Sequence, residues 1–171
     1  MLMNCFGTDL FQEGQSYNSW WDNYDSGLNS STVVAPSGIS LVWEPFYQGI
    51  NYCNTVTSRA EEVVGIDEVF KKQKMAEARF LRALSYWHGI DLFGKIPFYT
   101  EESTVGSEAP SQADRVTVFN FIESELTAIE GEMVAPGEQE YGRADRAAMA
   151  RVARVVRAWG DGYQNAGRPI Q

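Results

Sequence analysis

Apolar side chains recur at helical spacing after about residue 40, and this pattern predicts four helices. The first covers about residues 40–62, with Pro45 expected in its first turn because a missing N–H is tolerated there. The second covers about residues 67–93, the third about 117–133, and the fourth starts near Arg143. No segment shows convincing strand alternation, so the predicted fold class is all-α.

Two of the predicted helices carry clear apolar faces. The stripe of the second helix comprises Ala76, Phe80, Leu84 and Trp87, widened by Leu81 and Ile90. The third helix is expected to bury Val118, Ile122, Leu126 and Ile129. Arg79 and Arg82 lie on one flank of the second helix, where we expect them to pair with carboxylates of a neighbouring helix.

Residues 1–37 differ from the helical part of the chain. They are dense in Ser, Asn, Asp and Gly and show no sustained period, which predicts a loop-rich segment. Antiparallel helix pairs joined by loops over residues 40–150 indicate a helical-repeat scaffold, although no sequence period of about 34 residues is visible.

The overall charge is acidic. The chain of 171 residues is 44% hydrophobic, enough for one domain with a core, and its formal net charge is −9. A nucleic-acid binder needs a basic footprint, so nucleic acid is excluded as a partner. The charge is uneven, because six Arg and two Asp lie between Arg143 and the end.

The cysteine and histidine content argues against metal and cofactor chemistry. Cys5 and Cys53 make no disulfide framework, and His88 is the only histidine. None of the three has zinc-ligand spacing, and no Gly-rich phosphate loop is present. We therefore expect no metal and no cofactor, with Cys53 buried and reduced.

The sequence shows no segment for membrane insertion. No run of about 18 apolar residues exists, so no membrane span is expected. The start, "MLMNCFGTDLF", lacks the basic and apolar regions of a signal peptide, which makes Cys5 a poor lipidation site. As written, the chain would stay in the cytoplasm.

Acid–base catalysis has weak support in the sequence. Glu123 and Glu125 are two residues apart on a predicted helix and so point to different faces, which favours a solvated acidic face. The pair Glu101 and Glu102 has nothing to orient it for work on a glycosidic bond. His88 has no sequence-visible Ser or Cys partner. The chain is therefore predicted not to be an enzyme.

The N-terminal loop carries the residues best suited to a ligand. Rings and amides gather there: Phe11, Tyr17, Asn18, Trp20 and Trp21, followed by Asn23 and Tyr24. Sugars stack their C–H faces on rings while amides bond their hydroxyls, and a loop on rigid helices can present both. Alternatively, Trp20 and Trp21 anchor the loop on the helical body.

Five ordered blocks resemble the SusD/RagB family. The longest is "AEARFLRALSYWHGIDLFGKIPFYTEE" (Ala76–Glu102), which resembles the family signature of a scaffold helix followed by an "FG-x-x-P" turn. The others are "GTDLFQEG", "WEPFYQGINYCN", "RVTVFNFIESELTAIE" and "YGRADRAAMA". The resemblance covers roughly residues 7–150. It implies the N-terminal part of a SusD-like domain with a tetratricopeptide-like scaffold, in which His88 is structural.

The resemblance also implies a function. Members of this family are surface lipoproteins of Gram-negative bacteria that partner TonB-dependent transporters in glycan uptake. This chain would then bind an oligosaccharide without catalysis at the outer-membrane surface and deliver it to a SusC-like transporter. Contact with the membrane would come only through a lipid anchor that the start of this chain lacks.

The resemblance places candidate ligand residues near the "TD" turn. In the starch-binding founder of the family an Asn and a Trp after this turn contact sugar. An ungapped count puts Asn18 at that Asn and Glu13 at that Trp. The ring would then come from another aromatic residue of the loop: Phe11, Tyr17, Trp20 or Trp21.

Residues 151–171 depart from the family pattern and admit two interpretations. Val152, Val155, Val156 and Trp159 have the spacing of a basic amphipathic helix. The change to an Arg-rich composition also suggests that the tail from about Arg151 is read out of frame. A different class of function, a helical-repeat adaptor that binds protein segments, is the alternative to glycan binding.

Overall fold

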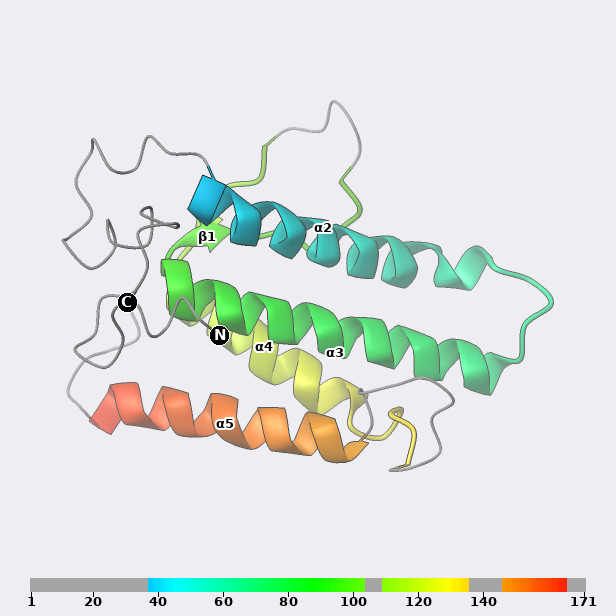
Figure 1. Cartoon of the computed structure of the whole chain (residues 1–171). Coiled ribbons are helices and arrows are strands. Elements are labelled where there is room, and N and C mark those ends of the chain that lie inside the picture. Colours follow the sequence, from blue (N-terminus) through cyan, green and yellow to red (C-terminus); the bar gives the residue numbers. More distant parts are fainter. Residues whose placement is uncertain (1–36, 104–108, 136–145, 166–171) are drawn as a thin grey trace, which may run out of the picture. The chain divides into compact units, whose positions relative to one another are not determined.

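The computed structural model describes residues 37–103, 109–135 and 146–165, with side chains described for residues 43–103, 109–135 and 147–161. The chain divides into two compact units, residues 1–47 and 48–171. In the described residues of the second unit, α-helices follow one another along the chain with alternating direction (Figure 1). The prediction of an all-α fold is confirmed.

The first two helices form a hairpin. Helix α2 spans Ser37–Arg59, and a short 3-10 helix, η3 (Ala60–Glu62), continues it. Helix α3 spans Glu68–Phe93, and the side chain of Asp67 caps its start by accepting a hydrogen bond from the Phe70 N–H. Gly94 ends α3 with a φ of 78°, a left-handed conformation that glycine adopts without a Cβ penalty.

A short pair of strands separates this hairpin from the next helix. Strand β1 (Ile96–Pro97) pairs antiparallel with β2 (Gln112–Ala113). Helix α4 (Arg115–Ile129) follows β2 directly, and its start is capped by Asp114. The strand pair was not predicted, because two residues per strand are too few to show alternation.

Helix α5 spans Arg146–Asn165 and packs against both α3 and α4 (Figure 1). It buries Met149, Ala153 and Val156, and Trp159 donates a hydrogen bond from Nε1 to Asp91 Oδ1 at 3.2 Å. The described part of the tail is therefore helical. Its reading frame stays a prediction, which the coding DNA would decide.

The core lies between α3 and α4. Val118, Ile122, Leu126 and Ile129 are all buried, as their spacing predicted. On α3, Ala76, Phe80 and Ile90 are buried, while Leu84 and Trp87 are half-buried. The rings of Tyr86, Phe98 and Phe121 meet edge to face, with centroids 5.0–5.8 Å apart.

Two sequence predictions about individual positions were wrong. Pro45 lies inside α2 rather than in its first turn, because the helix starts at Ser37, before the apolar pattern becomes visible. Leu81 is 43% exposed, so the buried stripe of α3 is narrower than its apolar residues suggested. Residues next to a helical stripe can be apolar and still face water.

Candidate functional site

Three polar side chains are buried in the described core: Asn54, Arg82 and Glu125. They come from α2, α3 and α4, and their exposed fractions are 0%, 5% and 7%. Burying a charge is unfavourable unless it is paired and hydrogen-bonded. We call these three residues the polar clasp, since they join three helices at one place.

The clasp is organised by the guanidinium of Arg82. Its Nη2 donates to Glu125 Oε2 at 2.7 Å, and its Nη1 donates to Asn54 Oδ1 at 2.8 Å. Arg79, one turn earlier on α3, donates from Nη2 to Glu125 Oε1 at 2.7 Å. Arg79 Nε also donates to Oε2 at 3.2 Å, so both arginines bind the Glu125 carboxylate and share that oxygen. The prediction that Arg79 and Arg82 pair with carboxylates of a neighbouring helix is confirmed.

The charge state of Glu125 follows from these contacts. Burial by itself would raise the pKa of Glu125, but the hydrogen bonds from Arg79 and Arg82 outweigh it and lower the pKa. The carboxylate therefore stays ionised and is a poor general acid. The predicted solvated acidic face is wrong for Glu125. Glu123 is the outward member, and it meets the half-exposed Arg157 at 3.3 Å.

The clasp also holds the chain segment that follows β1. The Nδ2 of Asn54 donates to the carbonyl oxygens of Tyr99 at 3.3 Å and Glu101 at 3.0 Å. Arg82 Nη1 donates to the intervening carbonyl of Thr100 at 3.2 Å. Three successive carbonyls that lie outside the helices and strands are thus bound by two side chains of the clasp.

Two further residues fasten this segment. The hydroxyl of Tyr86 donates to the carbonyl of Tyr99 at 2.6 Å and accepts its N–H at 3.2 Å. Asn51 Oδ1 accepts the N–H of Ser103 at 2.9 Å. Tyr86 is fully buried, and burial raises the pKa of its phenol well above the usual range. Its hydroxyl proton therefore stays available to the Tyr99 carbonyl.

The clasp positions a loop, and nothing in its chemistry suits bond making or breaking. It fixes residues 99–101, and Asn51 beside it holds Ser103, at the start of the connection from β1 to β2. Loops rooted in a rigid scaffold are where recognition residues are commonly carried.

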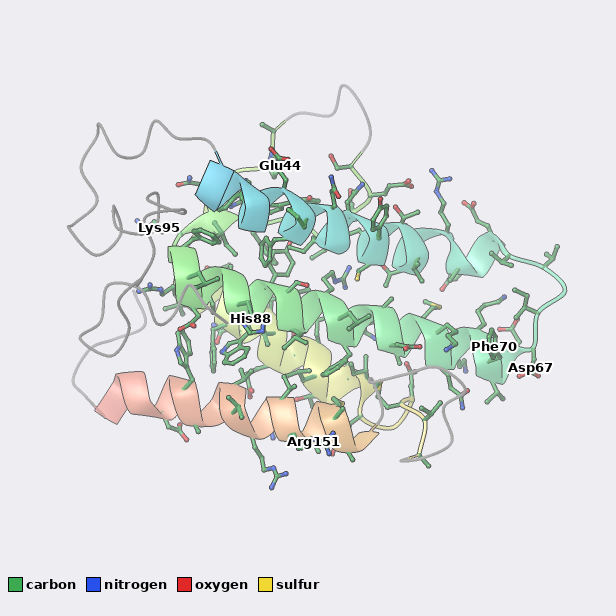
Figure 2. The ribbon with its side chains drawn as sticks, viewed as in Figure 1. Glu44, Asp67, Phe70, His88, Lys95 and Arg151 are labelled. Atoms are coloured by element: carbon green, nitrogen blue, oxygen red, sulfur yellow. The ribbon has the colours of Figure 1, made fainter. Side chains whose placement is uncertain are left out.

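The ligand residues expected from the sequence, Phe11, Tyr17, Asn18, Trp20 and Trp21, lie outside the described residues. His88 lies exposed on α3, where Figure 2 labels it. Cys53 is a half-buried free thiol, and burial raises the pKa of this thiol, which lowers its reactivity.

Among residues 37–103, 109–135 and 146–165, no group of three or more His, Cys, Asp or Glu could hold a metal ion. The described helices also contain none that is long and apolar enough to cross a membrane. The described part of the chain thus offers no metal centre.

Residues 5–156 match the SusD-like family described as "Starch-binding associating with outer membrane". The chain belongs to this family. It is 33% identical over 131 residues to the starch-binding protein SusD of Bacteroides thetaiotaomicron, covering 76% of this chain and 23% of that protein. Overall, the chain spans 20–29% of the length of the curated relatives it matches.

Solved structures agree with the fold. A laminarin-binding SusD-like protein is 26% identical, with a TM-score of 0.62 over 73% of this chain and 27% of that chain. Surface glycan-binding protein A from Bacteroides uniformis, at 20% identity, has a TM-score of 0.72 over 85% of this chain and 32% of its own. The predicted tetratricopeptide-like helical scaffold is therefore confirmed.

The sequence does not show the clasp as a unit, but Asn54 and Arg82 each have a recognisable signal. Asn54 occupies a position on the apolar face of α2, one turn after the buried Ile50. Arg82 lies between the buried residues Ala78 and Tyr86 on α3. A polar residue at an apolar position of a helix is the signal that could have found them.

Proposed function

We propose that this protein binds oligosaccharides at the cell surface without catalysis and delivers them to a SusC-like, TonB-dependent outer-membrane transporter. The observation that supports this most is the family match over residues 5–156. The names of the relatives add starch and laminarin as glycans that other members bind. The clasp supports a binding role without catalysis. It holds the segment after β1 in place, and it keeps the Glu125 carboxylate in ion pairs with Arg79 and Arg82.

Glycan contact is assigned to the N-terminal segment. We propose that Asn18 bonds sugar hydroxyls and that rings among Phe11, Tyr17, Trp20 and Trp21 stack on the sugar. The residue types fit, since a ring supplies a flat apolar face and an amide both donates and accepts hydrogen bonds. We propose no particular glycan, because an ungapped count from the "TD" turn puts Glu13 at the position of the founder's Trp.

The test is calorimetric titration of the 171-residue chain with starch, laminarin and xyloglucan oligosaccharides. Trp20→Ala, Trp21→Ala and Asn18→Ala are compared with Tyr52→Ala, a matched control ring on α2 that is 69% exposed. Losing a stacked and buried ring should weaken binding by roughly 1.5–3 kcal/mol, or about 10-fold to 150-fold. A folded chain that binds no glycan, or one weakened equally by Tyr52→Ala, would contradict the assignment.

Surface location and delivery need separate tests. We propose attachment at the outer face of the outer membrane through a lipid anchor. Protease added to intact cells should then remove the protein, whereas a cytoplasmic marker should survive. A SusC-like transporter should co-purify with it from detergent-solubilised outer membranes. Failure of co-purification would refute delivery and leave glycan binding standing.

A further inference from the structure

Helix α5 carries an exposed basic face on a chain that is acidic overall. The helix forms one edge of the helices in Figure 1, and its inner side buries Met149, Ala153 and Val156. On the opposite side Arg151, which Figure 2 labels, and Arg154 are exposed. The net charge of the whole chain is −9, so two neighbouring arginines make this side of α5 a local reversal of sign.

These two arginines have no counter-charge in the described part of the chain. No carboxylate whose side chain is described forms an ion pair with Arg151 or Arg154. Arg154 donates only from Nε, to the carbonyl of Ala150 at 3.3 Å. By contrast Arg157, one turn further along, meets Glu123 at 3.3 Å. The guanidinium groups of Arg151 and Arg154 are therefore available to an anion from outside the chain.

Helical spacing places an apolar residue beside each free arginine. Val155 follows Arg151 by one turn, and Ala158 follows Arg154 by one turn. Val155 is 52% exposed and Ala158 is also exposed. We call these four residues the arginine face. Each half of it offers a planar fork of N–H donors, which suits a carboxylate or a similar oxyanion, next to a small apolar surface.

The acidic residues near the arginine face leave its potential positive. Asp161 is the only acidic residue of α5, and it follows Arg154 by seven residues. The helical rise puts it about 10 Å further along the axis, beyond a Debye length of about 8 Å at physiological salt. Glu123, on the neighbouring helix α4, is paired with Arg157. An anion on the arginine face therefore meets two unopposed positive charges.

The surroundings favour an acidic glycan over other polyanions. A membrane-binding helix inserts its apolar face, but the apolar face of α5 is buried in the core. Duplex DNA carries one charge per roughly 1.7 Å and needs a larger basic footprint than two arginines in an acidic chain. A polysaccharide with charged sugars presents separated anions on rings that also have apolar C–H faces, and both features match the arginine face.

We propose that the arginine face is a binding site for an acidic polysaccharide. Its carboxylate or sulfate groups meet Arg151 and Arg154, while the C–H face of a sugar ring lies on Val155 and Ala158. The inference rests on the proposed function, because that function makes the ligand a glycan, and on α5 as this sequence encodes it. It needs none of the aromatic residues of the N-terminal segment.

The probe is a fluorescently labelled oligogalacturonate, compared with a neutral laminarin oligosaccharide of the same length. Fluorescence anisotropy with the 171-residue chain should show tighter binding of the oligogalacturonate, by about fivefold for two exposed ion pairs. Added salt should weaken the oligogalacturonate complex and leave the laminarin complex unchanged. A sulfated dextran oligosaccharide, tested in parallel, distinguishes sulfate from carboxylate as the preferred anion.

A charge-matched pair of variants makes the test specific. Arg151→Gln with Arg154→Gln removes two positive charges from the arginine face, and Lys72→Gln with Lys95→Gln removes the same charge from two exposed lysines elsewhere. The arginine variant should weaken oligogalacturonate about fivefold, and the lysine variant less than about twofold, because distant charges are screened. Arg151→Lys with Arg154→Lys should retain part of the affinity, since lysine keeps the charge without the planar fork. Circular dichroism confirms that each variant is folded.

Three outcomes would overturn the proposal. They are oligogalacturonate binding no tighter than laminarin binding, equal weakening by the arginine and lysine variants, and equally tight binding of a short duplex DNA or of anionic lipid vesicles. The last would show a surface that accepts any polyanion.

The same data separate this inference from the proposed function. Laminarin binding that Trp20→Ala weakens, without a preference for oligogalacturonate, would refute the arginine face alone. Oligogalacturonate binding that depends on Arg151 and Arg154 but not on Trp20 or Trp21 would keep the arginine face. It would contradict the assignment of glycan contact to the N-terminal segment.

Discussion

Replacing Glu125 by glutamine tests the polar clasp directly. Glu125→Gln keeps the size and one acceptor oxygen of the side chain but removes its charge. The guanidinium of Arg82, only 5% exposed, then stays buried without a counter-charge. Removing one partner of a buried ion pair typically destabilises by about 3–5 kcal/mol. Because glutamine retains an acceptor and Arg79 can turn toward water, the lower end, about 3 kcal/mol, is expected.

The matched control lies two residues away on the same helix. Glu123→Gln breaks a contact at 3.3 Å with an Arg157 side chain that is 51% exposed. A surface pair of this kind contributes about 0–1 kcal/mol. In a chain of this size, about 3 kcal/mol corresponds to a Tm lowered by roughly 6–12 °C, and the control should stay within about 4 °C of wild type.

The assay is urea and thermal unfolding followed by circular dichroism. Equal midpoints for Glu125→Gln and Glu123→Gln would refute the reasoning, since the two variants remove the same charge from the same helix. Hydrogen exchange gives a second readout. The Ser103 amide, held by Asn51 beside the clasp, should lose protection in Glu125→Gln if the clasp positions the segment after β1.

The pH dependence of stability has a definite sign. The pKa of Glu125 is lower in the folded chain than its ordinary value near 4.5. Between the two pKa values the unfolded chain binds more protons, so the free energy of unfolding falls as pH drops below about 4.5. Wild type should therefore lose more stability on acidification than Glu125→Gln, in which this group no longer titrates. Parallel pH profiles for the two proteins would contradict this account.

Three further predictions concern single contacts and use urea midpoints as the measurement. Tyr86→Phe should lower the free energy of unfolding by about 1–3 kcal/mol, because the Tyr99 carbonyl and N–H lose their hydrogen bonds to the hydroxyl. An unchanged midpoint would contradict this role of Tyr86. Gly94→Ala should destabilise by about 1–2 kcal/mol, since an L-residue at a φ of 78° is strained; a more stable variant would show that the turn can relax. Gly160→Ala should cost about 1–3 kcal/mol and loosen α5, because its Cβ would lie 2.6 Å from Phe119 Cζ; a neutral result would mean that this ring moves aside.

Sequence reasoning predicted the helices well because their signals are local. The period of 3.6 residues identified the buried face of α4, and Gly94 identified the end of α3. The two-residue strands β1 and β2 were too short to show any period. For the candidate site, the sequence predicted that Arg79 and Arg82 have carboxylate partners, but it did not predict which ones.

By itself, the sequence determined the fold class, the order of the helices and the family resemblance, because each depends on residue types at fixed spacing. Only the tertiary structure decided which residues meet in the polar clasp. Arg82 meets Asn54 from 28 positions away and Glu125 from 43 positions away. The same packing buried Glu125 and left Glu123 half-exposed, although both are glutamates on α4. Periodicity shows that a helix has a buried face, whereas the partner of that face depends on how the helices meet.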